Sequence, residues 1–177
     1  MRPVELILPT ILELTLPRNY NLKSLGLHMT AKILVINGPN LNILGRRPID
    51  HYGSIKLDQI NEKVAQHAGA LDVEVSFYQS NHEGDLVDHI QENWGNYEGI
   101  IINPGALTYY GYSLKDALID ANVPIIEVHL SNIHAREDWR SKSIIADVSH
   151  GQIAGFGWRS YTAAIDMMAG LIDDQKQ

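Results

Sequence analysis

Hydrophobic positions follow two alternating periods along the chain from Lys32 onward. Short runs rich in Ile and Val, or with apolar residues at every second position, predict β-strands. The predicted strands cover residues 32–37, 73–80, 99–103 and 124–130. Between them, apolar residues recur every three or four positions, which is typical of amphipathic α-helices. The predicted helices cover about residues 56–71, 84–94, 113–121 and 158–172.

This order, βαβαβαβ followed by a loop-rich stretch and a final helix, favours a single α/β domain. Right-handed crossovers between its strands would build a doubly wound, flavodoxin-like parallel sheet. The helical periodicity predicts that Leu71 and Trp94 face the core. Ser113 is the candidate N-cap of the third helix.

The first 30 residues do not share this pattern. Charged residues and prolines interrupt their apolar patches, at Glu5, Pro9, Glu13 and Pro17. A signal peptide would need a cleaner apolar region and a small-residue cleavage site. Met29 offers a second start. We therefore expect residues 1–30 to be an N-terminal extension, whether ordered or not, and residues 31–177 to form the single α/β domain that carries any catalytic site.

The charge balance of the chain argues against some classes of binding partner. The chain has 14 Lys and Arg against 21 Asp and Glu, a formal net charge of −7. This balance disfavours a nucleic-acid or anionic membrane surface as the main partner. No uninterrupted apolar run approaches the roughly 20 residues that a membrane span needs. Without cysteine, the chain has neither a disulfide framework nor a thiol nucleophile, so we expect a cytoplasmic protein that binds neither nucleic acid nor membrane.

Polar segments follow each of the four predicted strands. In chain order they read NGPN, QSNHEG, NPGALTYY and HLSNIHAR. Ordinary turn chemistry of Asn, Gly and Pro explains each loop separately, but it explains the histidines and arginines less well. In open α/β sheets, ligands bind beyond the carboxyl ends of the strands. The four segments therefore predict a pocket at one rim of the sheet.

Several kinds of site find no support in the sequence. No strand is followed by a GxxxxGK[ST] or GxGxxG phosphate-binding loop, and no serine lies in a GxSxG elbow. His129 and His134 lie five positions apart with Glu127 nearby. Neither that spacing nor its loop setting matches a zinc motif. No metal site is therefore expected.

The remaining residue types favour acid–base chemistry. A tyrosine has a pKa near 10, so ionising it at pH 7 costs roughly 4 kcal/mol. A guanidinium within about 4–6 Å lowers such a pKa by about 1–3. Arg46, Arg47 and Tyr52 lie on one short loop after the first strand, so they are candidates for an activated tyrosine base.

Four motifs give the chain a specific resemblance. They are INGPNLNILG, QSNHEG, NPGALT and IEVHLSNIHAREDWR, each at a predicted strand end. In this order they resemble type II 3-dehydroquinate dehydratases, over nearly all of residues 32–170. The resemblance implies a shikimate-pathway lyase of aromatic amino acid biosynthesis, which removes water from 3-dehydroquinate. It implies no metal and no organic cofactor.

The resemblance also implies a role for each matching residue in the chemistry. Tyr52 matches the general base that takes a proton from C2 of the substrate, and Arg47 matches the cation that lowers the pKa of that base. Asn40 matches the amide that stabilises the enolate through a water molecule. His129 matches the general acid that protonates the leaving C1 hydroxyl, with Glu127 placed to orient its ring.

A second set of matches concerns substrate binding and assembly. The matching substrate ligands are Asn103, the backbone of Leu130 with Ser131, and Arg140, with Arg136 in a supporting position. Asp116 matches a residue that reaches the site of a neighbouring subunit. The resemblance therefore implies self-association into trimers, assembled into a homododecamer.

The chain departs from the family pattern at two places. Its lid segment reads RRPIDHYG, with the proline one place early. Tyr109 stands where the family has a histidine, and we expect it to bind a substrate hydroxyl. One alternative is a catalytically impaired, ligand-binding homologue of the same fold. Another is an FMN-binding flavodoxin-like protein, which would need a phosphate loop that the sequence does not contain.

Overall fold

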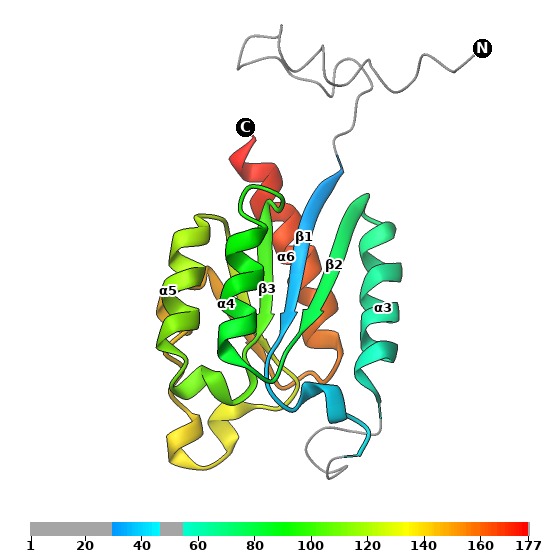
Figure 1. The fold of residues 1–177 in the computed structure, drawn as a ribbon. Helices are drawn as coiled ribbons and strands as arrows, with labels where there is room; N and C mark the ends of the chain where they lie inside the picture. Colours follow the sequence, from blue (N-terminus) through cyan, green and yellow to red (C-terminus); the bar gives the residue numbers. More distant parts are fainter. Residues whose placement is uncertain (1–29, 47–54, 177) are drawn as a thin grey trace, which may run out of the picture.

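The computed structural model describes residues 30–46 and 55–176, and its centre is a five-stranded parallel sheet (Figure 1). The strands are β1 (Ala31–Asn37), β2 (Val73–Gln79), β3 (Gly99–Asn103), β4 (Ile125–His129) and β5 (Gly151–Ala154). They lie in the order β2-β1-β3-β4-β5, and every neighbouring pair is parallel. This is the flavodoxin-like order, so the predicted fold class is confirmed.

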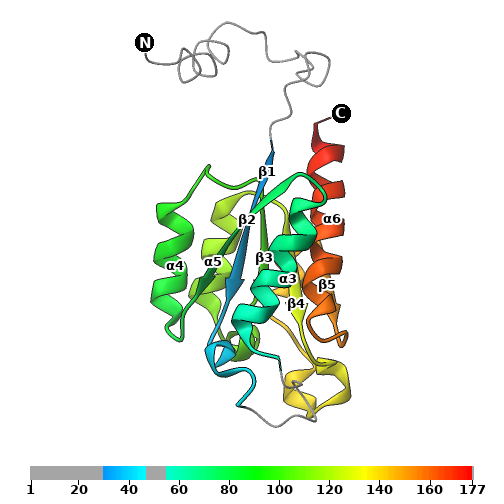
Figure 2. The same cartoon turned by 90° about the vertical axis from the view of Figure 1, so that its right-hand side faces the viewer.

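Helices cover both faces of the sheet. They are α3 (Leu57–Gly69), α4 (Glu83–Glu92), α5 (Tyr112–Ala121) and α6 (Arg159–Gln175). Figure 2, which views the sheet edge-on, shows α3 and α6 on one side and α4 and α5 on the other. The three layers enclose two hydrophobic clusters, one on each face of the sheet.

Alternation along β1 explains why this strand is central. Ile33 and Val35 belong to the cluster on the α3 and α6 side, whereas Leu34 and Ile36 belong to the cluster on the α4 and α5 side. All four are essentially inaccessible to solvent. Successive side chains of a strand point to opposite faces, so a strand with no polar face is stable only between two helical layers.

Two residues predicted to face the core are exposed, because the helices end earlier than the hydrophobic pattern suggests. Helix α3 ends at Gly69, and Leu71, in the turn that follows, is 43% exposed. Helix α4 ends at Glu92, and Trp94 is 54% exposed. Helical periodicity places a side chain only while the backbone remains helical. Both predictions were therefore wrong.

Ser113 does not cap α5. The helix begins at Tyr112, with Gly111 as its N-cap and no side-chain hydrogen bond from the cap. Instead, Glu83 of α4 accepts the backbone N–H of Leu114 at 3.0 Å. That N–H is one of the donors that lack a partner inside the first turn of a helix, so a neighbouring helix replaces the predicted cap.

Several parts of the chain lie outside this description. They are residues 1–29, 47–54 and 177. The N-terminal extension and the placements of Arg47 and Tyr52 therefore stay predictions.

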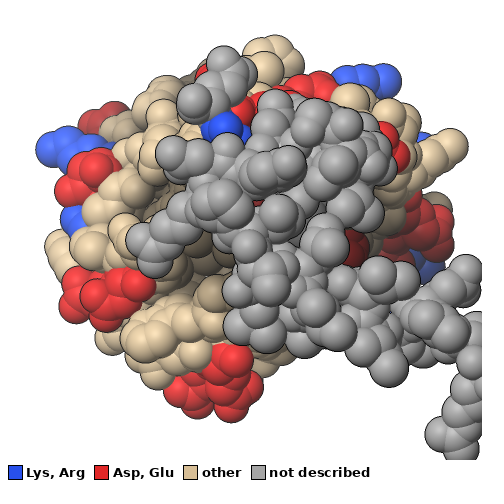
Figure 3. Space-filling view, turned by 90° about the horizontal axis from the view of Figure 1, so that it is seen from above, with Lys and Arg blue, Asp and Glu red and all other residues tan. Residues whose placement is uncertain are grey.

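Figure 3, seen from the end where the strands begin, shows Asp and Glu side chains scattered around the visible rim. Within residues 30–46 and 55–176, no helix is long and apolar enough to cross a membrane.

Candidate active site

A cavity of about 230 Å³ lies at the carboxyl ends of three adjacent strands, β1, β3 and β4. The loops after β1 and β3 line it with Asn40, Asn103 and Tyr109. The end of β4 and the loop beyond line it with His129, Leu130, Ser131, Arg136 and Arg140. Chain connections leave β1 and β3 in opposite directions, and ligands bind at such switch points in doubly wound sheets.

The first two loops meet backbone to backbone. Gly38 donates its N–H to the Asn103 carbonyl at 2.8 Å, and a Cβ at position 38 would overlap the Pro104 carbonyl. Only glycine permits this approach. Two residues later, Asn40 adopts a left-handed conformation (φ 67°) and donates its N–H to the Asn81 side chain at 2.9 Å. Asparagine tolerates that conformation better than most residues, so the turn carries Asn40 to the cavity wall.

Glu127 and His129 form a buried acid–base pair. They lie two positions apart on β4 and so point to the same face of the sheet. Glu127 is 0% exposed and His129 is 5% exposed, and Nε2 of the imidazole lies 2.6 Å from Oε1 of the carboxylate. A buried carboxylate favours a proton on the facing nitrogen. The other ring nitrogen, Nδ1, is then the one that can exchange a proton with a ligand.

The side chain of Asn103 is oriented by a hydrogen bond to Tyr161 of helix α6. Its side-chain amide donates a hydrogen bond to the Tyr161 hydroxyl at 2.9 Å, and that hydroxyl donates to Asn37 at 2.6 Å. The side-chain carbonyl oxygen of Asn103 accepts the Gly105 N–H at 3.2 Å. Burial raises the pKa of Tyr161 well above its usual range, so the phenol stays protonated. The amide of Asn103 retains a second N–H for a ligand.

Arginines and aromatic rings form another part of the cavity wall. The guanidinium of Arg140 lies 3.9 Å from the ring centroid of Trp139, and Tyr109 meets Trp139 edge-on at 5.0 Å. Glu137 accepts a hydrogen bond from Nε of Arg140 at 3.0 Å and lies 3.6 Å from Nε of Arg136. A backbone hydrogen bond, aided by the two arginines, lowers the pKa of Glu137. These contacts hold two guanidinium groups and one carboxylate beside the cavity, a net positive charge that favours an anionic ligand.

Comparison with known families agrees with this geometry. The sequence model of the family described as dehydroquinase class II matches residues 31–169. The chain belongs to the class II dehydroquinases. The resemblance of its four motifs is thereby confirmed, and the chain is an enzyme, a hydro-lyase of the 3-dehydroquinate dehydratase type.

Individual relatives of this dehydroquinase cover almost the same segment. A 3-dehydroquinate dehydratase of Roseiflexus castenholzii is 55% identical over 139 residues, 78% of this chain and 88% of the relative. One from Halothermothrix orenii is 48% identical over 141 residues, 80% of this chain and 95% of the relative. The crystal structure of the type II dehydroquinase from Butyrivibrio crossotus superposes with a TM-score of 0.76 at 45% identity, over 78% of this chain and 97% of that one.

The structure brings most of the predicted site residues of the dehydroquinase together. Of the rest, Arg47 and Tyr52 lie outside the described residues, and Asp116 lies exposed on α5, away from the cavity. Three other residues were not anticipated: Trp139, Ser143 and Tyr161. Trp139 stands inside a motif quoted above, whereas nothing in a single sequence links Ser143 to Glu127 or Tyr161 to Asn103. Within the described residues, no group of three or more His, Asp or Glu could hold a metal ion.

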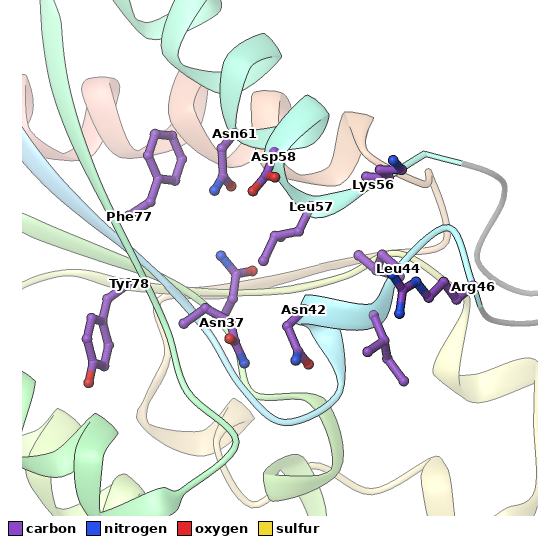
Figure 4. Close-up of a pocket in the computed structure, with 12 residues that line it drawn as sticks. Asn37, Asn42, Leu44, Arg46, Lys56, Leu57, Asp58, Asn61, Phe77 and Tyr78 are labelled. Atoms are coloured by element: carbon purple, nitrogen blue, oxygen red, sulfur yellow. The ribbon is translucent and has the colours of Figure 1, made fainter.

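A second cavity of the dehydroquinase, about 470 Å³, lies between the start of α3 and the ends of β1 and β2 (Figure 4). Asp58 and Asn61 extend toward it from α3, and Arg46 and Lys56 stand at its rim. Those two rim residues flank the undescribed residues 47–54. The lid segment that the sequence predicts falls among those residues and so outside the described part of the chain.

Proposed function

We propose that this dehydroquinase removes water from 3-dehydroquinate to give 3-dehydroshikimate, in the cytoplasm and as part of the shikimate pathway. The observation that carries the proposal is the buried Glu127–His129 pair, whose histidine lines the cavity. It supplies a proton donor where the family requires one. The names of the curated relatives support the same reaction.

In the proposed mechanism, Tyr52 acts as the base. With Arg47 favouring its ionised form, it takes a proton from C2, next to the ketone. The resulting enolate is stabilised by Asn40 through a water molecule. Collapse of the enolate then forms the C1–C2 double bond and expels the C1 hydroxyl, which leaves as water after accepting a proton from Nδ1 of His129. The protons removed and delivered balance, so no redox step is needed.

The remaining cavity residues hold the substrate. Asn103 has a spare amide N–H for a substrate hydroxyl, and Tyr109 is placed to meet another. The backbone of Leu130 with Ser131 binds the carboxylate, and Arg140 contributes positive charge. Arg140 is held by its contacts with Trp139 and Glu137. A fixed cation costs less entropy when the substrate binds, which supports its role as a substrate ligand.

We also propose self-association through α5, into trimers and then a dodecamer. Tyr112, Asp116 and Ile119 are spaced four and three residues apart, so they share one face of that helix. Tyr112 is 64% exposed and Ile119 is 51% exposed. Exposed apolar groups around a carboxylate suit an interface at which Asp116 reaches a second site. Analytical ultracentrifugation tests this, and a monomer at micromolar concentration would contradict it.

The domain boundary is a further part of the proposal. We assign residues 31–177 to the catalytic domain and residues 1–30 to an N-terminal extension. Two observations support the division: β1 begins at Ala31, and the family match also begins there. Deleting residues 1–29 should leave kcat within about twofold, because the deletion stops short of the first core strand. A loss of folding would contradict the boundary.

The test of the proposed reaction is direct. Purified protein is mixed with 3-dehydroquinate, and absorbance of the conjugated enone product is followed with time. Turnover that disappears in His129→Ala, with the fold retained by circular dichroism, supports the proposal. A protein that binds 3-dehydroquinate by calorimetry but yields no enone would instead support the catalytically impaired homologue.

A further inference from the structure

The Ser143 hydroxyl lies against the carboxylate of Glu127. Its oxygen is 2.8 Å from Oε1 and 2.9 Å from Oε2. Glu127 therefore contacts two polar side chains, His129 on its own strand and Ser143 in the loop between the short helices 138–140 and 146–148. The two contacts share Oε1, so one carboxylate links the loop to the histidine.

The direction of the serine hydrogen bond follows from a count of its hydrogen-bonding groups. The same Ser143 oxygen accepts the backbone N–H of Ile145 at 3.0 Å and that of Ala146 at 3.1 Å. A hydroxyl has two acceptor lone pairs and one donor hydrogen. Both lone pairs are thus occupied, and the only remaining capacity is the O–H. The Ser143 hydroxyl must therefore donate its hydrogen bond to Glu127. A donated hydrogen bond stabilises the ionised form of a carboxylate.

The position of Ser143 is fixed by its neighbours. The side chain of Ile145 is 0% exposed in the cluster on the α4 and α5 side, and the N–H of Ile144 donates to the Thr108 carbonyl at 2.9 Å. The loop is therefore anchored to the core and to the segment that carries Tyr109. A donor anchored in this way restricts rotation of the carboxylate that it binds.

We propose that Ser143 is a positioning residue for the dehydration, which keeps Glu127 ionised and turned toward Nε2 of His129. The inference rests on the proposed function, in which His129 gives a proton to the leaving hydroxyl. An ionised carboxylate buried without enough hydrogen bonds is costly, and Ser143 supplies a donor that His129 alone does not. Loss of the donor makes Glu127 easier to protonate, and a neutral Glu127 no longer supports a positively charged imidazole.

The test compares Ser143→Ala with Ser143→Thr, using the full chain and 3-dehydroquinate. For Ser143→Ala we expect kcat to fall about tenfold, as loss of one hydrogen bond to a charged group does, while KM stays within about twofold. The acidic limb of the kcat–pH profile should move to higher pH. Ser143→Thr keeps the hydroxyl, so it should restore both kcat and the profile.

The control is Ser149→Ala. Ser149 directly follows the short helix 146–148, and its hydroxyl donates to the Ile145 carbonyl at 3.0 Å. Ser149→Ala should lower thermal stability about as much as Ser143→Ala does, but it should leave kcat and the pH profile unchanged. If the unmodified enzyme is active and Ser143→Ala retains its kcat and pH profile, the positioning role is wrong. An unmodified protein without turnover would overturn the proposed function, and this role with it.

Discussion

The Tyr161 hydroxyl accepts a hydrogen bond from the Asn103 amide at 2.9 Å, although 58 positions separate the two residues. Tyr161 lies on α6, behind the sheet, whereas Asn103 ends β3 at the cavity. The tyrosine is 0% exposed. A helix of the outer layer therefore sets the orientation of a side chain that we propose to bind substrate.

Tyr161→Phe should separate this orienting role from the packing of the ring. The phenyl ring still fills the core, but Asn37 and Asn103 each lose a buried partner. We expect the free energy of unfolding to fall by about 1–3 kcal/mol and KM to rise a few fold. Urea titration and steady-state kinetics measure the two effects. Tyr110→Phe is the matched control, since Tyr110 is 56% exposed and its substitution should change neither.

Tyr52→Phe should remove nearly all turnover. Without the phenol there is no base at C2, but the other binding groups remain. Substrate affinity, measured by calorimetry, should stay within about tenfold of the unmodified enzyme. A near-normal kcat in this variant would refute the assignment of Tyr52 as the base.

Arg47→Ala should change the pH profile as well as the rate. We propose that the guanidinium favours the ionised form of Tyr52, so its removal makes the tyrosine harder to ionise. Activity should then rise only at higher pH than in the unmodified enzyme. Arg46→Ala serves as the control, because Arg46 is exposed and, unlike Arg47, matches no catalytic residue of the family. A profile of unchanged shape in Arg47→Ala would contradict the tuning role.

His129→Ala should lower kcat by about 10²–10⁴-fold, since the leaving hydroxyl loses its proton donor. The variant also leaves the buried carboxylate of Glu127 without its hydrogen-bonding imidazole partner, so some loss of stability is expected. The double variant His129→Ala with Glu127→Gln removes that charge. It should recover stability in thermal unfolding but not turnover. Full kcat in His129→Ala would contradict the role of general acid.

Tyr109→Phe tests the position at which the chain departs from its family. The phenyl ring keeps the edge-on contact with Trp139 and removes only the hydroxyl. One hydrogen bond made equally in the ground and transition states contributes about 0.5–1.5 kcal/mol, so KM should rise roughly 2- to 10-fold while kcat is unchanged. Tyr109→His restores the family residue and should keep activity. An unchanged KM in Tyr109→Phe would make Tyr109 a pocket wall only.

The fold was predictable wherever the buried residues of a strand or helix recur at regular spacing along the sequence. The run at β1 and the spacing of Leu114, Ala117 and Leu118 on α5 predict their environments, because burial there follows backbone geometry. β5 was missed. It has only four residues, pairs with a neighbour on one side, and is stabilised by the ladder that β4 offers rather than by its own pattern.

The site was predictable at the strand ends and much less so beyond them. Asn103 and His129 are the last residues of core strands and Asn40 lies three residues beyond one, all within quoted motifs, so the sheet itself places them at one rim. Ser143 depends instead on a loop whose path no period describes. Its contact with Glu127 joins positions 16 residues apart, and such a contact arises only when the loop is anchored in three dimensions.

The close approach of Gly38 and Pro104 has a consequence for substrate range. Main chain, not side chains, sets the distance between the loops after β1 and β3. Substitutions that trim the side chains of these loops therefore leave the spacing of the two backbones unchanged. Variation among natural relatives, or in directed evolution toward larger cyclic hydroxy acids, has room to act instead on the aromatic side chains of Tyr109 and Trp139, which line the cavity and supply removable volume.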